Sequence, residues 1–373
     1  MRSGSSSASR WLSKTMAGVY ISYPFCAQKC TYCNFASGVF PREIEPLYLD
    51  AVRGELRNTE WRWTPETVYL GGGTPSLIDT ETLSALLSEI PGGEWQEATM
   101  EAAPGGITPD TASSWRRAGI SRVSLGVQSF NTRELARTGR KHTAEVVEHE
   151  IELLRAAGLG NFNLDLIAGL PGQTLESWNH SLDWVVRLNA PHVSIYMLEV
   201  DADSRLGAEV MAFGKRYGAQ DIPSDDMIAD FYEIAVERLV RAGIARYEIS
   251  NFARPGFESR HNLKYWRREP YMGFGADAHS FDGEWRWQNP ESIEEYVRGS
   301  KSERIAADPT GEHFFLGLRL SQGITSVNPG DWSAFRPAIE RLIRDGLLEA
   351  DDTALRLTAR GVLLSNEVFA EFV

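Results

Sequence analysis

The sequence contains no apolar run that approaches the roughly 20 residues needed to cross a bilayer as a helix. Cysteine is scarce, with 3 among 373 residues, and an odd, clustered set does not suit a disulfide framework. A basic excess is also missing, because 38 Lys and Arg stand against 51 Asp and Glu, a formal charge of −13. These absences argue against a membrane-spanning protein, a disulfide-rich secreted protein and a protein that grips a nucleic-acid backbone.

The rest of the composition is that of an ordinary soluble globular protein, with 42% apolar and 24% charged residues. The length predicts either one large domain accompanied by a smaller one or two domains. Residues 1–17 are rich in serine and lack acidic residues, so we expect a disordered leader. A transit peptide is one interpretation, and a translation start at Met16 is the one we favour. Without an apolar signal segment, and with clustered thiols that favour a reducing compartment, the expected location is cytoplasmic.

Strand and helix patterns alternate from residue 19 to residue 242. Glycine follows three of the helices, at Gly119, Gly158 and Gly243, where a left-handed residue commonly ends a helix. Six strand–helix units in series predict a parallel sheet with helices outside it. The predicted strands are 19–24, 67–71, 98–102, 122–128, 162–168 and 193–199, and the predicted helices are 45–58, 80–90, 109–118, 143–157, 175–188 and 225–242.

Polar side chains gather where these strands end. Glu101, Gln128, Asp165 and Glu199 lie at or near four strand ends, and a loop with all the cysteines follows the first strand. Chemistry in parallel barrels collects at the carboxyl ends of the strands. The sequence therefore predicts an α/β fold, a partial (β/α)6 TIM-like barrel, with its site at that end.

The last third of the chain has a different pattern. Residues 245–300 are irregular, aromatic and rich in glycine. Helical stretches at 312–320 and 335–345 precede two short strands joined by an acidic turn, an order typical of a small winged-helix-like α+β domain. The acidic residues near the turn favour packing or partner binding over DNA binding.

All three cysteines, Cys26, Cys30 and Cys33, stand in the stretch YPFCAQKCTYCNF. The spacing CxxxCxxC lets a short loop hold three irons of a 4Fe-4S cluster and leaves the fourth iron open. The amino and carboxylate groups of S-adenosylmethionine (SAM) can chelate that iron. A zinc site is the alternative, but zinc needs a fourth ligand, and the nearest downstream histidine is His142.

Several motifs together resemble a known family. Nearly all of residues 19–373 is spanned by VYISYPFCAQKCTYC, YLGGGTPSLI, EAAPGGIT, VSLGVQSFN, LDLIAGLPGQT, HNLKYW and LTARGVLLSNEVFAEF. The combination resembles the coproporphyrinogen dehydrogenase-like radical SAM proteins, which have an oxidase branch (HemN) and a heme-chaperone branch (HemW). The resemblance implies a radical SAM barrel with a 4Fe-4S cluster, SAM and heme.

The resemblance also implies a SAM site. Gly72 and Gly73 can let a ligand approach bare backbone, although a tight turn alone also explains them. Glu101 can accept hydrogen bonds from ribose hydroxyls and Arg140 can pair with a carboxylate, the alternative being solvated charges. The residues that match the family's SAM-contacting positions are Tyr20, Tyr32, Gly72, Gly73, Thr74, Glu101, Gln128, Arg140 and Asp165. Whether one or two SAM molecules bind stays open.

The motif HNxxYW is present as His261, Asn262, Tyr265 and Trp266. A neutral imidazole can ligate heme iron, and aromatic rings can lie against a porphyrin. His261, Tyr265 and Trp266 are therefore the expected heme contacts. A histidine with a purely structural hydrogen bond is the alternative, and His279 is a spare candidate ligand.

Two functions follow from the resemblance. The oxidase branch carries a further cysteine two residues after the third, whereas Phe35 stands there in this chain. The resemblance thus favours a heme chaperone that binds heme and delivers it to recipient hemoproteins. The alternative is an oxygen-independent coproporphyrinogen III oxidase, which performs a radical oxidative decarboxylation. An RNA-modifying enzyme conflicts with the charge of −13.

The expected organisation has four parts: a leader at 1–17, a radical SAM partial barrel at 18–250, a connecting region with HNxxYW at 251–308 and a winged-helix-like domain at 309–373. Catalytic residues stay unassigned. Whether SAM is cleaved and whether the protein forms a homodimer are left open.

Overall fold

The structure is a computed structural model, and it describes residues 17–300, 303–324 and 329–373. The expected leader lies outside the described residues except for Ala17, which instead begins the first strand. Within the described ranges, no helix combines the length and the apolar character that crossing a membrane requires.

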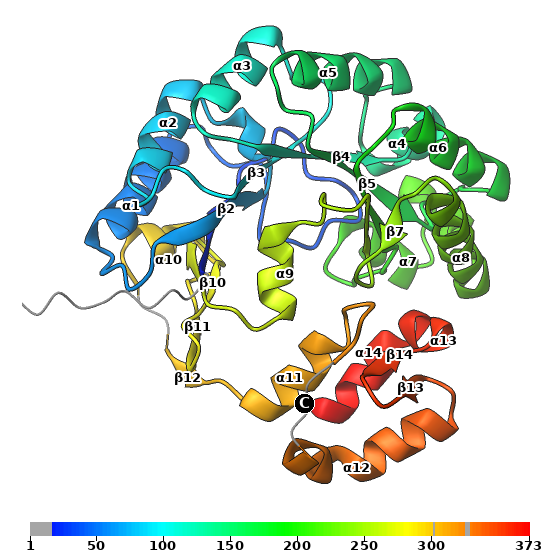
Figure 1. Cartoon of the computed structure of the whole chain (residues 1–373). Helices are drawn as coiled ribbons and strands as arrows, with labels where there is room; N and C mark the ends of the chain where they lie inside the picture. Colours follow the sequence, from blue (N-terminus) through cyan, green and yellow to red (C-terminus); the bar gives the residue numbers. More distant parts are fainter. Residues whose placement is uncertain (1–16, 301–302, 325–328) are drawn as a thin grey trace, which may run out of the picture.

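Six parallel strands form the centre of a single sheet and follow one another in sequence order. They are β1 (Ala17–Tyr23), β2 (Pro65–Gly72), β3 (Glu97–Ala102), β4 (Arg122–Gln128), β5 (Phe162–Ala168) and β6 (His192–Met197). The helices outside the arc are α1 (Ile44–Asn58), α2 (Thr80–Ser88), α3 (Pro109–Arg117), α5 (Ala144–Ala156), α6 (Leu175–Arg187) and α8 (Asp225–Arg241) (Figure 1). All six predicted units are confirmed, and no bound differs by more than two residues.

Local signals explain why these bounds were predictable. Thr108 and Thr174 form capping boxes at the starts of α3 and α6, which satisfies backbone N–H groups that have no partner inside the helix. Gly119, Gly158 and Gly243 adopt left-handed φ angles of 100°, 81° and 76° after α3, α5 and α8. Residues close in sequence therefore determine where these helices begin and end.

The strands present different side chains to their two faces. On β2, Val68 and Leu70 are fully buried in the hydrophobic core, while the alternate residues Thr67 and Tyr69 make polar contacts to other elements of the barrel. Because successive side chains of a strand point to opposite faces, the apolar set packs under the outer helices and the polar set lines the inside of the arc. The inner surface is therefore a place for polar chemistry.

The expectation of an irregular region at 245–300 is wrong. This stretch adds strands to both edges of the sheet: β9 pairs in parallel with β1, and β8 pairs antiparallel with β6. These strands have two to four residues, too few to give a period-two signal in the sequence. Its elements are β7 (Ala245–Arg246), β8 (Asn251–Ala253), α9 (Arg260–Trp266), β9 (Tyr271–Phe274), β10 (His279–Phe281), β11 (Trp285–Gln288) and α10 (Ile293–Val297), with β12 (Ile305–Ala306) following. Helices α4 (Thr132–Thr138) and α7 (Arg205–Met211) were also not predicted.

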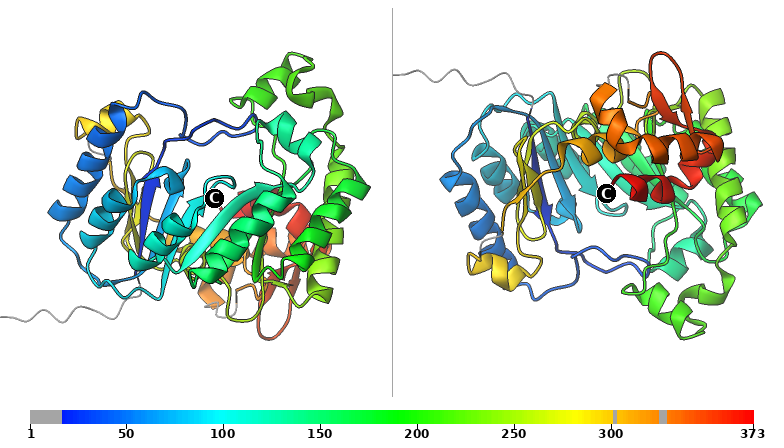
Figure 2. Two further views of the ribbon diagram at one scale, coloured as in Figure 1. Left: turned by 90° about the horizontal axis from the view of Figure 1, so that it is seen from above. Right: turned by 90° about the horizontal axis from the view of Figure 1, so that it is seen from below.

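The C-terminal domain has the expected order of two helices and a hairpin. It comprises α11 (Pro309–Gly317), α12 (Pro329–Arg344) and the antiparallel pair β13 (Leu348–Ala350) and β14 (Leu355–Leu357), followed by the additional short helices α13 (Ala359–Leu363) and α14 (Ser365–Phe369). Glu312 of α11 pairs with both Arg268 and Arg286. The Arg319 guanidinium lies 4.4 Å from the Trp266 ring centre. The domain is thus fastened to the barrel through α9 and the sheet extension, and Figure 2 shows it on one side of the ring of helices.

Candidate functional site

The cysteine loop runs from β1 across the carboxyl end of the barrel to the opposite helices (Figure 2). At its start, the Cys26 N–H donates to the Gly38 carbonyl at 2.8 Å. At its middle, the Thr31 N–H donates to the carbonyl of Thr138, the last residue of α4, at 3.2 Å, and the Leu206 N–H of α7 donates to the Thr31 carbonyl at 2.8 Å. Backbone bonds to three parts of the chain therefore hold the loop where barrel chemistry is expected.

The three thiols of this loop are free and partly buried. Burial raises the pKa of the Cys26 thiol, while the nearby Thr74 and Ser37 hydroxyls act in the opposite direction. Among the described residues, no three His, Cys, Asp or Glu side chains are gathered closely enough to hold a metal ion. His142 is not part of the loop, because it is buried with Nε2 at 3.0 Å from the Val127 carbonyl oxygen.

The GGGTP turn after β2 packs directly on the start of the cysteine loop. The Gly73 N–H donates to the Tyr23 carbonyl at 2.7 Å, and the Thr74 N–H donates to the Phe25 carbonyl at 2.9 Å. A Cβ atom on Gly73 would lie only 2.6 Å from the Phe25 carbonyl oxygen. Gly72 has a left-handed φ of 106°. Position 73 must therefore be glycine, because a side chain there would prevent this backbone contact. Sequence reasoning had offered the approach of a ligand as one explanation for this glycine and a tight turn as the other.

Replacing Gly73 with Ala should lower the free energy of unfolding by about 2–3 kcal/mol, because backbone on both sides must move to accept the methyl group. Chemical denaturation measures the change. Gly54→Ala is the control, since nothing lies within 4 Å of a Cβ atom at that helical position and alanine there should stabilise by about 1 kcal/mol. Equal stability of the Gly73→Ala variant and the native protein would contradict the packing argument.

A cavity of about 130 Å³ opens beside the cysteine loop, between β1, β2 and β3. Glu101 lies in its wall, where Oε1 accepts from the Tyr69 hydroxyl at 2.9 Å and Oε2 accepts from the Gly72 N–H at 3.2 Å. Burial and the neighbouring Asp165 charge raise the pKa of Glu101 to about 7. The lining residues are Tyr20, Ser22, Pro24, Phe35, Ala36, Ser37, Gly72, Glu101 and Asp277.

Four other expected residues meet on the β4–β5 side of the barrel. Arg140 donates from Nη1 to the Gly126 carbonyl at 2.7 Å, and its guanidinium lies near enough to the Tyr32 hydroxyl and the Cys30 thiol to interact with them electrostatically. Gln128 is buried and left-handed, with a φ of 69°, at an irregularity in the β4–β5 pairing. Asp165 accepts from the Asn163 amide at 2.7 Å, and burial raises its pKa. The nine expected SAM residues thus surround the carboxyl end of the barrel, from both sides of the cysteine loop.

The HNxxYW motif lies elsewhere, on α9. His261 is fully buried, and its ring nitrogens lie 2.9 Å from Thr67 Oγ1 and 2.7 Å from the Tyr265 hydroxyl. The ring also packs against Gly18, at the amino-terminal end of β1, where it would meet a Cβ atom. Burial lowers the pKa of His261 to about 3, so the imidazole is neutral. In this conformation neither nitrogen is free to ligate iron, and the ring sits among the first residues of β1 and β2.

Glu97, the first residue of β3, holds the start of α9. Its carboxylate accepts from the backbone N–H groups of Arg260 and His261, each at 3.0 Å. At the other end of α9, Trp266 contacts Arg319 of the C-terminal domain. The motif therefore joins the amino-terminal ends of the strands to that domain. His279, the spare candidate, is exposed on β10.

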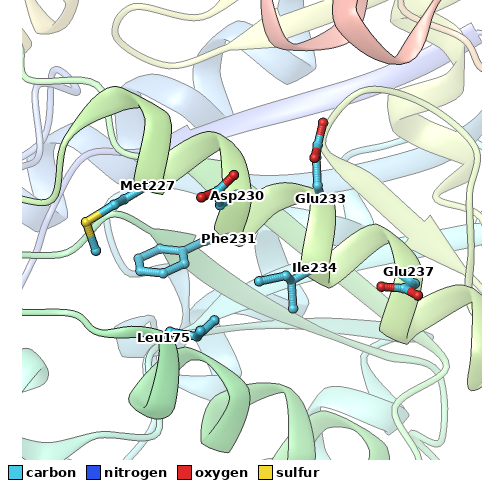
Figure 3. Close-up of a pocket in the computed structure, with 7 residues that line it drawn as sticks. All are labelled: Leu175, Met227, Asp230, Phe231, Glu233, Ile234 and Glu237. Atoms are coloured by element: carbon cyan, nitrogen blue, oxygen red, sulfur yellow. The ribbon is translucent and has the colours of Figure 1, made fainter.

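A larger groove, of about 340 Å³, lies on the outer surface between α6 and α8 (Figure 3). Leu175, Met227, Phe231 and Ile234 form its apolar part, and acidic residues of α8 flank it. None of the expected site residues lines this groove. It is therefore separate from the cysteine loop and its cavity.

Sequence reasoning missed two residues of the cavity region. Tyr69 binds Glu101 and stands two residues before Gly71 on β2, so the period-two pattern could have shown that it shares the inner face. Asp277 gave no signal, because it reaches the cavity only through the pairing of β9 with β1.

Comparisons with known proteins agree with this architecture. Residues 20–185 match the profile of the Radical SAM superfamily, and residues 307–364 match that of the HemN C-terminal domain. Coproporphyrinogen III oxidase (HemN) from Escherichia coli superposes with a TM-score of 0.80 over 98% of this chain and 91% of that chain. Because only 22% of the residues are identical, this likeness supports the fold alone.

Curated relatives are more similar in sequence. The heme chaperone HemW of Bacillus subtilis is 33% identical, with 96% of this chain and 99% of that protein covered. HemW of Mycobacterium tuberculosis is 37% identical over 94% of this chain and 93% of that protein, and HemW of Escherichia coli is 32% identical over 95% and 97%. With identities above 30% along nearly the full length of both partners, the chain belongs to the HemW family of radical SAM proteins.

Proposed function

We propose that the protein is a heme chaperone, which binds heme and delivers it to hemoproteins, and that it carries a 4Fe-4S cluster with SAM as a further ligand. The observation that carries the proposal is full-length similarity to several proteins named heme chaperone HemW. The cysteine loop at the carboxyl end of the barrel supports the cluster, because it stands where such barrels place their chemistry.

We propose that Cys26, Cys30 and Cys33 hold the cluster. Three thiol donors on one loop, without a fourth protein ligand, fit a cubane with one open iron better than they fit zinc. The bound cluster supplies an electron that can break a carbon–sulfur bond of SAM. The protein's own part is to fix the loop through Thr31 and to keep the Arg140 cation beside Cys30.

We propose that SAM lies in and above the cavity at β1–β3. Glu101 has two carboxylate oxygens in the cavity wall, and these can accept hydrogen bonds from ribose hydroxyls. Arg140 offers a guanidinium for the amino-acid end of SAM. The full proposed set is Tyr20, Tyr32, Gly72, Gly73, Thr74, Glu101, Gln128, Arg140 and Asp165.

SAM affinity should depend on pH through Glu101. Its pKa is raised to about 7, so the carboxyl group loses its charge as the pH falls below that value and becomes a weaker acceptor near a cationic ligand. Affinity should therefore fall by up to about tenfold per pH unit below 7 and level off above it. Calorimetric titration across this range measures the effect. Glu101→Gln should bind weakly at every pH, and an unchanged pH profile in that variant would contradict the assignment.

The oxidase alternative is not favoured. Phe35 occupies the position where the oxidase branch has a further cysteine, and its side chain is 67% exposed beside the cavity. This chain therefore lacks the thiol that distinguishes the oxidase branch. Anaerobic incubation with coproporphyrinogen III, SAM and a reductant should therefore give no protoporphyrinogen.

We propose HNxxYW as the heme site, with His261, Tyr265 and Trp266 as contacts. This proposal comes from the motif and has a structural requirement: Tyr265 must release Nε2 of His261, and α9 must move away from the strands to admit a porphyrin. The Trp266 indole N–H is buried without a hydrogen-bond partner among the described residues, so this side chain gives up no hydrogen bond when α9 moves. The buried Lys264, which pairs with Glu66 of β2, must break that ion pair.

The function is tested by heme transfer. The protein is reconstituted without oxygen, loaded with heme and mixed with a heme-free b-type hemoprotein, and the recipient's absorption spectrum is followed. We expect transfer to be faster than from heme bound to serum albumin, which provides a passive donor control. A protein that binds no heme, or that releases it no faster than the control, is not a chaperone.

The remaining expectations are proposals as well. We propose a barrel at 18–250, a connecting region at 251–308 and a C-terminal domain at 309–373, a division that Glu312 and Arg319 bridge. Clustered free thiols support a reducing, cytoplasmic environment. A homodimer and particular recipient hemoproteins stay as proposals for solution experiments.

A further inference from the structure

The cavity at the cysteine loop contains a backbone outlier. Asp277 has a φ of 61°, in the left-handed region that favours glycine, and it lies in the turn between β10 and β9, the strand that flanks β1. Its N–H donates to the Pro290 carbonyl at 2.9 Å, and its Oδ1 accepts from the Gln288 amide. The surrounding turn thus fixes the conformation, and an aspartate is held where a glycine would cost nothing.

Asp277 is one of the residues that line the cavity. Asp277 and Glu101 both line it, and both charges act on the Tyr20 hydroxyl, which lines it too. No Lys, Arg or His is among the lining residues. Among the described residues, none donates a hydrogen bond to Oδ2 of Asp277. Two carboxylates that face one small space without a cation in its wall create a site that favours a positively charged ligand.

We propose that Asp277 is a specificity-determining residue that recognises the sulfonium charge of SAM. This inference rests on the proposed SAM site. S-adenosylhomocysteine has the same adenosine and amino-acid groups, but a neutral thioether replaces the sulfonium. A carboxylate within the cavity stabilises the sulfonium and does nothing comparable for the thioether. Asp277 thereby raises the affinity for SAM relative to S-adenosylhomocysteine.

The experiment compares two variants of the anaerobically reconstituted protein. Asp277→Asn removes the charge and keeps a residue that tolerates the left-handed region, while Asp277→Gly removes the side chain and relieves the backbone. Isothermal calorimetry gives the Kd for SAM and for S-adenosylhomocysteine. We expect the SAM Kd to rise about tenfold in both variants while the S-adenosylhomocysteine Kd changes by less than about twofold. The melting temperature of Asp277→Gly should not fall.

A matched control separates backbone strain from recognition. Asn189 is another left-handed residue, with a φ of 48°, in the turn between α6 and β6. Asn189→Gly should leave the ratio of the two Kd values unchanged. An unchanged ratio in Asp277→Asn, or an equal loss for both ligands, would overturn the inference while the SAM site stands. A native protein that binds no SAM would overturn the proposed site and this inference together.

Discussion

Cys30→Ala is expected to abolish the iron–sulfur chromophore. The loop has three thiols for three irons, so the loss of one leaves a second iron without a protein ligand. Cys30 is the most informative choice because its thiol lies beside both Arg140 and Tyr32. Visible absorption and the iron and sulfide content of protein purified without oxygen measure the result.

The matched control for this experiment is Ser37→Ala. Ser37 lies near the Cys26 thiol but is not one of the proposed ligands, so this variant should keep iron and sulfide at the native stoichiometry. Full iron and sulfide in the Cys30→Ala protein would refute the cluster assignment. Zinc in the native protein, in place of iron, would refute it as well.

His261→Ala is expected to lower the free energy of unfolding by roughly 4 kcal/mol, whatever its effect on heme. The substitution leaves a cavity beside Gly18 and removes the partner of both the Thr67 and the Tyr265 hydroxyls inside the barrel. Because the imidazole is buried and neutral, no charge compensates for the loss. Urea denaturation of the anaerobic protein measures the change, and a loss below about 1 kcal/mol would contradict a structural role.

Tyr265→Phe distinguishes a heme ligand from a structural histidine. The variant keeps the aromatic ring against Tyr271 but frees Nε2 of His261 from its hydrogen bond. If His261 ligates heme, the variant should bind heme more tightly than the native protein, and His261→Ala should lose the Soret band while it is still folded. If neither variant changes heme affinity, the ligand is another group, and the exposed His279 is the next residue to test.

The barrel could be predicted closely because its signals are local. Thr108 before Pro109 predicts the start of α3, and Gly119 predicts its end. The bounds of such a unit therefore depend on residues close to it in sequence. The strands β9 to β12 could not be predicted, because they have two to four residues and exist through pairing with distant strands. These strands are stable only within the assembled sheet, so the periodicity of the sequence does not predict them.

The site was predictable in its residues more than in its arrangement. Glu101 lies at the carboxyl end of the barrel, as its place at a strand end suggested, whereas Arg140 follows α4 and reaches β4 through the Gly126 carbonyl. At Gly73 the backbone of the cysteine loop lies where a Cβ atom would be, so close packing alone explains the glycine, as the tight-turn alternative allowed. His261 shows the wider difficulty: a motif states which groups are present, but burial and hydrogen-bond partners depend on where α9 packs.

The parallel pairing of β1 with β9 joins positions near 18 and 271. During synthesis, β1 remains an open edge until the ribosome has released more than two thirds of the chain. For most of translation, β1, which precedes the three thiols, can therefore pair with β2 on one side but not yet with β9 on the other. We therefore expect iron–sulfur assembly to find a fully supported loop only late in translation, once residues 271–274 have left the ribosome.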